Sequence, residues 1–167
     1  MTPVVSVVGR PGVGKTTFLE KLIPELKRRG YRVGTVKHDR SGFEIDHPGK
    51  DTWRHAQAGS DVVVISSPQK MALIRHVDAE LTLDEIVKSM PPVDIVITEG
   101  YKRENKPKIE VSRHEISTAL VCSGPDLIAI VADQPFPSAV RQFRLDDAKG
   151  VADLLEREYI LVAQGAA

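Results

Sequence analysis

A glycine-rich stretch near the N-terminus constrains the fold of this chain more than any other feature. Residues 9–16, Gly-Arg-Pro-Gly-Val-Gly-Lys-Thr, have the spacing of a phosphate-binding P-loop. The stretch follows a valine-rich run at residues 4–8 and precedes an apolar pattern of helical spacing at residues 18–23. A P-loop requires this order, because its loop joins a buried strand to the start of a helix. The sequence therefore predicts a nucleotide-binding α/β domain.

The residue types of this loop suit the binding of phosphate. Glycines let backbone N–H groups close round a phosphate without hindrance from a Cβ atom, and the helix start adds partial positive charge. Lys15 is expected to reach the β- and γ-phosphates, Thr16 to bind Mg²⁺ through its hydroxyl, and Thr17 to hydrogen-bond the α-phosphate. The predicted nucleotide-binding residues of the loop are Gly9, Gly12, Val13, Gly14, Lys15, Thr16 and Thr17.

The hydrophobic pattern of the remaining chain predicts a P-loop-type three-layer sandwich with a mostly parallel central sheet. Apolar runs rich in β-branched residues predict strands at residues 3–8, 31–37, 61–66, 93–100, 127–132 and 140–145. Apolar residues at helical spacing predict helices at residues 15–29, 51–58, 81–90 and 146–159. Residues 70–75 are expected to pair with residues 61–66 as a hairpin, which adds a β region outside the parallel sheet.

Three short segments carry more specific expectations. Pro24 lies inside the first helical pattern and should kink or divide that helix. Phe43 and Ile45 alternate with charged residues and predict a short exposed strand, while residues 109–111 alternate in the same way and predict an edge strand. Because no repeat or linker is evident, residues 1–160 are predicted to form one nucleotide-binding domain, with residues 161–167 as a frayed tail.

Three carboxylates near the ends of predicted strands are candidates for the site. Glu99 ends the strand at residues 93–100, where a carboxylate beside a P-loop binds Mg²⁺ directly or through water. Asp39 follows the second strand, where P-loop proteins place a residue that contacts Mg²⁺ or the attacking water. Asp133 ends a later strand and is a candidate for guanine recognition, although the chain contains no Asn-Lys-x-Asp sequence. Simpler interpretations are a solvated strand end for Glu99, a turn carboxylate for Asp39 and a capping group for Asp133.

The predicted catalytic residues are accordingly Lys15, Asp39 and Glu99, and the predicted Mg²⁺ ligands are Thr16 and Glu99. Lys50 lies in a polar segment together with other cations and is a further nucleotide-binding candidate, although such a set also suits a solvated face. No residue in the sequence is an evident general base or arginine finger. Slow nucleotide hydrolysis is therefore expected.

Composition excludes several partners and compartments. The chain has 23 Lys and Arg against 23 Asp and Glu, so no overall field favours nucleic acid or a membrane surface. No apolar run approaches the roughly 18 residues of a membrane-spanning helix. The single Cys122 fits a reducing compartment. A cytoplasmic protein is the resulting expectation.

Several motifs together resemble the MobB family of molybdopterin-guanine dinucleotide biosynthesis adaptors. They are the P-loop and residues 37–39, 46–54, 58–59, 98–102 and 105–111, and they follow the family order to about Asp133. The resemblance implies a protein that binds GTP, hydrolyses it weakly, and assists the MobA guanylyltransferase, which attaches GMP to molybdopterin. It also implies a homodimer formed through β elements outside the central sheet. Molybdopterin or its guanine dinucleotide stays open as a further ligand.

Two other functions are compatible with the residues alone. A small-molecule kinase of the P-loop class would turn over ATP rapidly once its acceptor is supplied, but no arginine-rich lid helix is evident. An interaction module whose nucleotide fixes its dimer state would bind nucleotide without chemistry. Comparing GTP with ATP discriminates the first of these from a GTP-binding adaptor.

Overall fold

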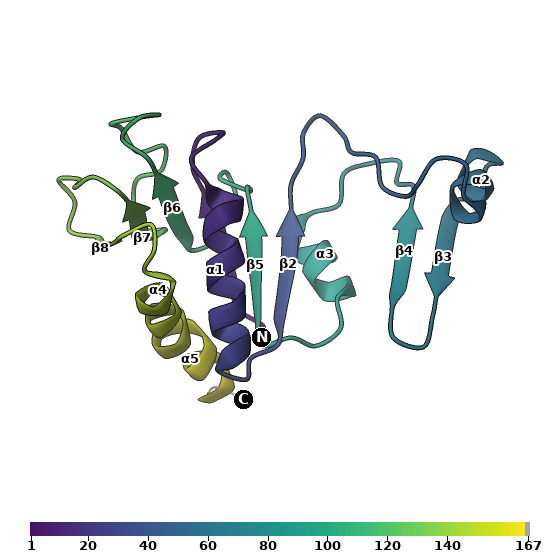
Figure 1. The fold of residues 1–167 in the computed structure, drawn as a ribbon. Helices are drawn as coiled ribbons and strands as arrows, with labels where there is room; N and C mark the ends of the chain where they lie inside the picture. The colour runs from purple at the N-terminus through teal and green to yellow at the C-terminus, as the bar shows by residue number, and fades with distance from the viewer. Residues whose placement is uncertain (166–167) are drawn as a thin grey trace. The chain divides into compact units, whose positions relative to one another are not determined.

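The computed structural model describes residues 1–165, which form two compact units (Figure 1). The sheet unit comprises residues 1–38 together with residues 90–165, and the hairpin unit comprises residues 39–89. Of the tail predicted to be frayed, residues 161–165 form helix α5 (Leu161–Gly165), and residues 166–167 lie outside the described residues.

Six strands form the central sheet of the sheet unit, and every neighbouring pair is parallel. Their order is β2-β5-β1-β6-β7-β8. The bounds are β1 (Val4–Val8), β2 (Val33–Lys37), β5 (Ile95–Glu99), β6 (Lys108–Ser112), β7 (Leu127–Ala132) and β8 (Arg141–Phe143). The chain passes from β5 on one side of β1 to β6 on its other side, so β1 is the switch point of the sheet. Open parallel sheets bind ligands beyond the carboxyl ends of their strands at such a point.

Helix α1 (Lys15–Arg28) and helix α4 (Ala148–Leu155) pack together over one face of this sheet (Figure 1). Leu22 and Leu26 are fully buried in the core that these helices share with the strands. Pro24 does not divide α1, because it lies on the exposed side of the helix, where water can satisfy the backbone carbonyl group that loses its partner. Gly30 ends the helix: its φ is +91°, and the Tyr31 N–H donates to the Leu26 carbonyl oxygen at 3.2 Å.

The prediction of an edge strand at residues 109–111 is wrong, because β6 is an internal strand and all of its residues are buried. Backbone groups satisfy its buried Glu110, and backbone carbonyl groups together with the Asp126 carboxylate, 3.1 Å away, satisfy its Lys108. The Lys108 ammonium donates to the Glu104 carbonyl oxygen at 2.7 Å. The Glu110 carboxylate accepts from the N–H groups of Val121 and Cys122 at 2.7 and 2.9 Å, while burial raises the pKa of Glu110.

The hairpin unit contains an antiparallel pair of strands, β3 (Val62–Ser66) and β4 (Met71–Arg75), as the sequence predicts. Its helices are α2 (Asp51–Gln57) and α3 (Leu83–Ser89). A capping box begins α3, since the Thr82 N–H donates to the Glu85 carboxylate at 2.8 Å and the Glu85 N–H donates to the Thr82 hydroxyl at 3.3 Å.

The short strand predicted around Phe43 and Ile45 is wrong. Residues 39–50 contain no strand, and these two side chains are 76% and 63% exposed. Alternation of apolar and charged residues produces a strand only where a partner strand supplies hydrogen bonds, and this segment pairs with none in the hairpin unit.

An ion network joins the end of α1 to the C-terminal helices. The side chain of Arg29, only 11% exposed, contacts the carboxylates of Glu25, Asp153 and Glu156 at 2.9, 2.7 and 2.7 Å. The Tyr31 hydroxyl donates to Glu156 at 2.6 Å. Asp153 belongs to α4, and Glu156 begins the π-helical segment η1 (Glu156–Ile160). One guanidinium therefore fixes how these helices pack.

Replacing Arg29 by alanine is expected to lower the free energy of unfolding by about 2 kcal/mol, because three carboxylates are left without their shared cation. Urea unfolding of the variant measures this loss. Arg28→Ala is the matched control: that side chain is 68% exposed, and its loss should leave the free energy of unfolding nearly unchanged. Equal losses in the two variants would contradict a special role for Arg29.

Stability should also fall in acid through Glu25. Hydrogen bonds from Arg28 and Arg29 lower the pKa of Glu25 to about 2. A folded-state pKa below the unfolded value stabilises the fold above the unfolded pKa, near 4.3, and this contribution disappears as the pH falls towards 2. We expect Glu25→Gln to flatten the decline in unfolding free energy between about pH 5 and pH 2. Parallel declines in the wild-type protein and the variant would exclude this effect.

Candidate functional site

The candidate site lies at the carboxyl ends of the parallel strands. The loop that leads into α1 is at the end to which the arrows of β2, β5 and β6 point (Figure 1). Because all six strands run in the same direction, the residues at these ends share one edge of the sheet. They are the P-loop after β1, Lys37 in β2, Glu99 in β5, Arg113 after β6 and Asp133 after β7.

The P-loop backbone needs glycine at three positions. Gly9, Gly12 and Gly14 have φ values of +144°, +79° and +91°, which L residues rarely adopt. A Cβ atom on Gly9 would also lie 2.3 Å from the carbonyl oxygen of Val111, which is backbone and cannot move aside. Gly14 is the N-cap of α1, and its carbonyl oxygen accepts from the Phe18 N–H at 2.9 Å. The loop therefore passes directly into a helix N-terminus.

Thr16 and Glu99 meet at this edge. The Thr16 hydroxyl lies 3.0 Å from each carboxylate oxygen of Glu99. In the strand register Glu99 pairs with Val7 of β1 and with Lys37 of β2, so these three side chains share one face of the sheet. Val7 belongs to the core beneath α1, which explains why Glu99 faces the start of that helix.

These two residues fit a magnesium ion by their chemistry. Mg²⁺ prefers hard oxygen ligands and is bound by one or two protein groups together with phosphate oxygens and water. A threonine hydroxyl and a carboxylate are such ligands, and both converge at the phosphate loop. Thr16 and Thr17 are both exposed, so a ligand can reach them.

The Lys15 ammonium group is held over the start of its own loop. It donates to the carbonyl oxygens of Gly9 and Arg10 at 3.2 and 3.0 Å. Burial is the main cause that lowers the pKa of Lys15, while Glu99 raises it and Lys37 lowers it further. This geometry folds the ammonium group back towards the backbone that would surround a phosphate.

Asp39 and Lys50 belong to the hairpin unit, and their role at the nucleotide stays a prediction. The Asp39 carboxylate accepts from the Ser41 N–H at 2.9 Å, a local turn contact. Lys50 is exposed at the N-cap of α2. Asp133 accepts from the His114 N–H at 2.8 Å, which is the capping role that its position also allowed. Recognition of guanine by Asp133 likewise stays a prediction.

Arg113 is a site residue that the sequence reasoning did not single out. Its Nε–H donates to the carbonyl oxygen of Val13 in the P-loop at 3.0 Å. The only signal for it in the sequence is an arginine directly after a strand, and its proximity to the loop depends on β6 lying beside β1. The rings of His38 and Tyr101 also meet at this edge, with centroids 4.7 Å apart, and the sequence did not predict this contact.

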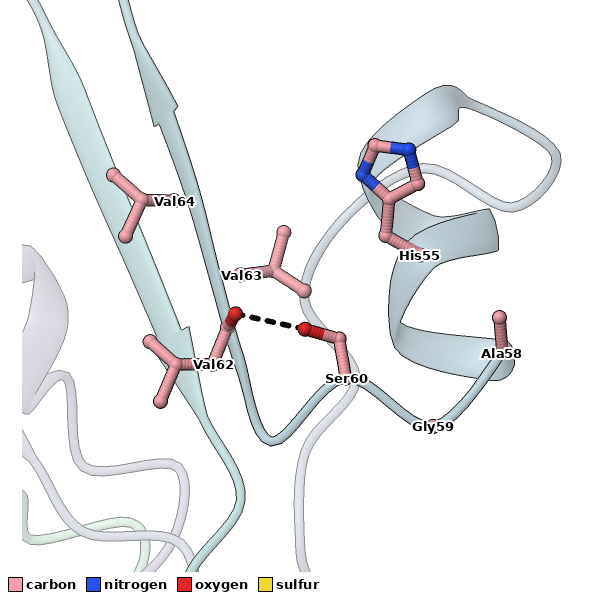
Figure 2. Close-up of a pocket in the computed structure, with 7 residues that line it drawn as sticks. All are labelled: His55, Ala58, Gly59, Ser60, Val62, Val63 and Val64. Atoms are coloured by element: carbon pink, nitrogen blue, oxygen red, sulfur yellow. Dashed lines mark hydrogen bonds between the residues drawn. The ribbon is translucent and has the colours of Figure 1, made fainter.

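A separate pocket lies in the hairpin unit between α2 and β3 (Figure 2). It is lined by His55, residues 58–60 and residues 62–64, and the Ser60 hydroxyl donates to the Val62 carbonyl oxygen at 2.9 Å. Its lining includes none of the site residues predicted from the sequence. Within residues 1–165, no helix is both long and apolar enough to cross a membrane.

A parallel sheet with a P-loop after its switch-point strand, and a hydroxyl–carboxylate pair at the following helix, defines a P-loop NTPase-like α/β protein. The family model "Molybdopterin guanine dinucleotide synthesis protein B" matches residues 4–133. The chain belongs to this family, MobB, which confirms the resemblance seen in its motifs. The predicted fold class is confirmed as well.

Individual relatives agree with this assignment. The molybdopterin-guanine dinucleotide biosynthesis adapter protein of Haemophilus influenzae is 32% identical over 156 residues, covering 92% of this chain and 88% of that protein. The crystal structure of Bacillus subtilis MobB has a TM-score of 0.74 at 28% identity and covers 92% of this chain and 96% of that chain. GTPase Der of Salinispora tropica is 26% identical over 140 residues, which are 81% of this chain but 30% of that longer protein.

Proposed function

We propose that this protein is a cytoplasmic GTP-binding adapter in the biosynthesis of molybdopterin guanine dinucleotide, where it assists a MobA-type guanylyltransferase. The observation that carries the proposal is the family match over residues 4–133, which contains the P-loop, Glu99 and Asp133. The name of the Haemophilus influenzae relative supports the adapter role. The P-loop geometry and the likeness to GTPase Der support a nucleotide ligand.

In this proposal three sets of protein groups bind different parts of the nucleotide. The N–H groups of the P-loop cradle the α- and β-phosphates, and Lys15 moves from its own loop carbonyls to the β- and γ-phosphates. Thr16 and Glu99 hold Mg²⁺, which when bound would neutralise phosphate charge. Asp133 is proposed for guanine, Asp39 for contact with Mg²⁺ or the attacking water, and Lys50 as a further nucleotide-binding residue.

Hydrolysis is expected to be weak. The Glu99 carboxylate is directed at Thr16 as a metal ligand, so it is not available as a base for an attacking water molecule. The bound nucleotide then serves as a conformational signal or as a substrate delivered to the partner enzyme.

Reconstitution tests the adapter role directly. A MobA-type guanylyltransferase, molybdopterin, GTP and Mg²⁺ are incubated with and without this protein, and the dinucleotide formed is measured. The protein should raise dinucleotide formation several-fold, and Lys15→Ala should abolish the increase. Arg28→Ala, at the opposite end of α1, should act like the wild-type protein. An equal yield with and without the protein would contradict the adapter role.

We further propose that a second copy of this chain covers one face of the β3–β4 hairpin. Four apolar side chains on that face are between 45% and 66% exposed: Val62, Val64, Met71 and Leu73. A two-stranded sheet is marginally stable by itself, and two such hairpins can complete one another by burying their apolar faces. This arrangement agrees with the homodimer implied by the family resemblance.

Leu73→Asp should convert the dimer to a monomer, because burying an unpaired carboxylate costs about 3 kcal/mol or more, about 100-fold in affinity. Light scattering after size exclusion gives the mass of each variant. Ile65→Asp is the matched control, since Ile65 is 55% exposed but lies on the opposite face of the hairpin. A monomeric wild-type protein, or a dimer that survives Leu73→Asp, would contradict this surface.

A further inference from the structure

Strand β6 lies against the P-loop at Gly9, and the connection after β6 lies against it at Gly12 and Gly14. The position of a Cβ atom on Gly9 is 2.3 Å from the Val111 carbonyl oxygen, and that on Gly12 is 3.6 Å from the Ile116 side chain. The position on Gly14 is 3.4 Å from both Nε and Nη2 of Arg113. We call residues 113–117 the brace turn. A side chain at Gly9 would collide with β6, whereas the brace turn lies at ordinary contact distance from the positions at Gly12 and Gly14.

The brace turn is itself held firmly. The N–H groups of Ile116 and Ser117 donate to the Arg113 carbonyl oxygen at 3.0 and 2.9 Å. From the end of β7, Asp133 accepts from the His114 N–H at 2.8 Å. Gln134 donates its amide to the Ser117 carbonyl oxygen at 2.7 Å. Both ends of the turn are therefore tied to the central sheet, and the guanidinium group extends from a rigid base.

The Arg113 contact determines the direction of one peptide in the P-loop. Its Nε–H donates to the Val13 carbonyl oxygen at 3.0 Å. A trans peptide is planar, so the N–H of Gly14 points away from that carbonyl, opposite to Arg113. In P-loops, backbone N–H groups that point into the loop cradle the α- and β-phosphates. A cationic donor on the carbonyl also polarises the peptide, which makes the N–H on its other side a stronger donor.

We propose that Arg113 is a positioning residue of the phosphate site, which orients and polarises the Val13–Gly14 peptide so that the Gly14 N–H binds the α- or β-phosphate of the nucleotide. This inference rests on the proposed nucleotide-binding function. It also gives Asp133 a second role, because the contact of Asp133 with His114 keeps Arg113 in place. The guanidinium acts through the peptide and touches no phosphate in this arrangement.

The test compares Arg113→Ala and Arg113→Lys with the wild-type protein by titration with GDP and with GTP in Mg²⁺. Both nucleotides carry the α- and β-phosphates, so Arg113→Ala should lower the affinity for GDP and for GTP by a similar factor of about tenfold. Arg113→Lys keeps the charge but loses the directed Nε–H, and should weaken both by about threefold. Arg28→Ala removes the same charge from the far end of α1 and should change neither affinity.

A spectroscopic readout separates positioning from a general structural role. In ¹⁵N-labelled protein, GDP should shift the amide proton of Gly14, and this shift should be smaller in Arg113→Lys and smallest in Arg113→Ala. GDP affinity within about twofold of wild type in both variants, or a Gly14 shift unchanged by either substitution, would overturn the inference. If Arg113→Ala does not fold, the GDP affinity and the Gly14 amide shift of Arg113→Lys alone test the inference. A wild-type protein that binds neither nucleotide would instead overturn the proposed function and this inference together.

Discussion

GTP binding should weaken by about 100-fold when Lys15 is replaced by alanine, because a charge-assisted contact to phosphate is worth about 3 kcal/mol. The Lys15 ammonium donates to two carbonyl oxygens of its own loop, at 3.2 and 3.0 Å. Binding therefore exchanges weak backbone contacts for a contact with anionic oxygen atoms. Calorimetric titration of the wild-type and variant proteins with GTP in Mg²⁺ measures the difference.

Lys21→Ala is the matched control for this substitution. Lys21 lies further along α1, and its ammonium group donates to the Leu145 carbonyl oxygen at 3.4 Å. Its replacement removes the same charge but should leave GTP affinity within about twofold. Unchanged GTP binding in Lys15→Ala, or an equal loss in Lys21→Ala, would show that the P-loop is not the binding site.

Glu99→Gln should remove most of the effect of Mg²⁺ on GTP affinity. We expect Mg²⁺ to strengthen GTP binding to the wild-type protein by at least about tenfold, and to the variant by about twofold or less, because an amide is a far weaker ligand for a hard cation. In EDTA the variant should bind GTP at least as well as wild type, since one negative charge beside the phosphates has been removed. GTP titrations of the wild-type protein and of the variant, each in excess Mg²⁺ and in EDTA, give the four affinities needed.

Glu20→Gln provides the control for charge, because Glu20 is exposed on α1. It should leave the effect of Mg²⁺ intact. Thr16→Ser should also retain it, whereas Thr16→Ala should lose it in the same way as Glu99→Gln, since both residues are proposed to hold the same ion. A normal Mg²⁺ dependence in Glu99→Gln would remove this carboxylate from the metal site.

The sequence was sufficient to predict the phosphate loop and its partner carboxylate for a physical reason. Both are local signals: the glycine spacing sets the loop conformation, and Glu99 directly ends a strongly apolar strand. Parallel strands bring their carboxyl ends to one edge, so Glu99 could be assigned to the loop without knowledge of the strand order. The contact of Glu99 with Thr16 at 3.0 Å agrees with that assignment.

Arg113 and the true position of β6 depended on non-local information. The charged residues Lys108 and Glu110 suggested an edge strand, but both have partners within the fold. Lys108 contacts the Glu104 carbonyl oxygen and the Asp126 carboxylate, and Glu110 accepts from the Val121 N–H. A pattern of alternating polarity cannot reveal such partners. Because β6 was predicted at the edge of the sheet, Arg113 was not placed beside β1 and its loop.

The hairpin unit illustrates the same limit of local patterns. The β3–β4 pairing follows from two apolar runs joined by a short turn, and the predicted hairpin is confirmed. Phe43 and Ile45 have the alternation of a strand but no neighbour to pair with. Strand formation depends on that neighbour as much as on the residues themselves.

The most direct test of the central claim, that this chain is a GTP-binding adapter of the MobB family, is a parallel titration of the purified protein with GTP and with ATP in Mg²⁺. We predict that GTP binds at least about tenfold more tightly than ATP and that Lys15→Ala weakens GTP binding by about 100-fold. Equal affinity for the two nucleotides, or tighter binding of ATP with rapid turnover once a small-molecule acceptor is added, would contradict the claim and favour a kinase.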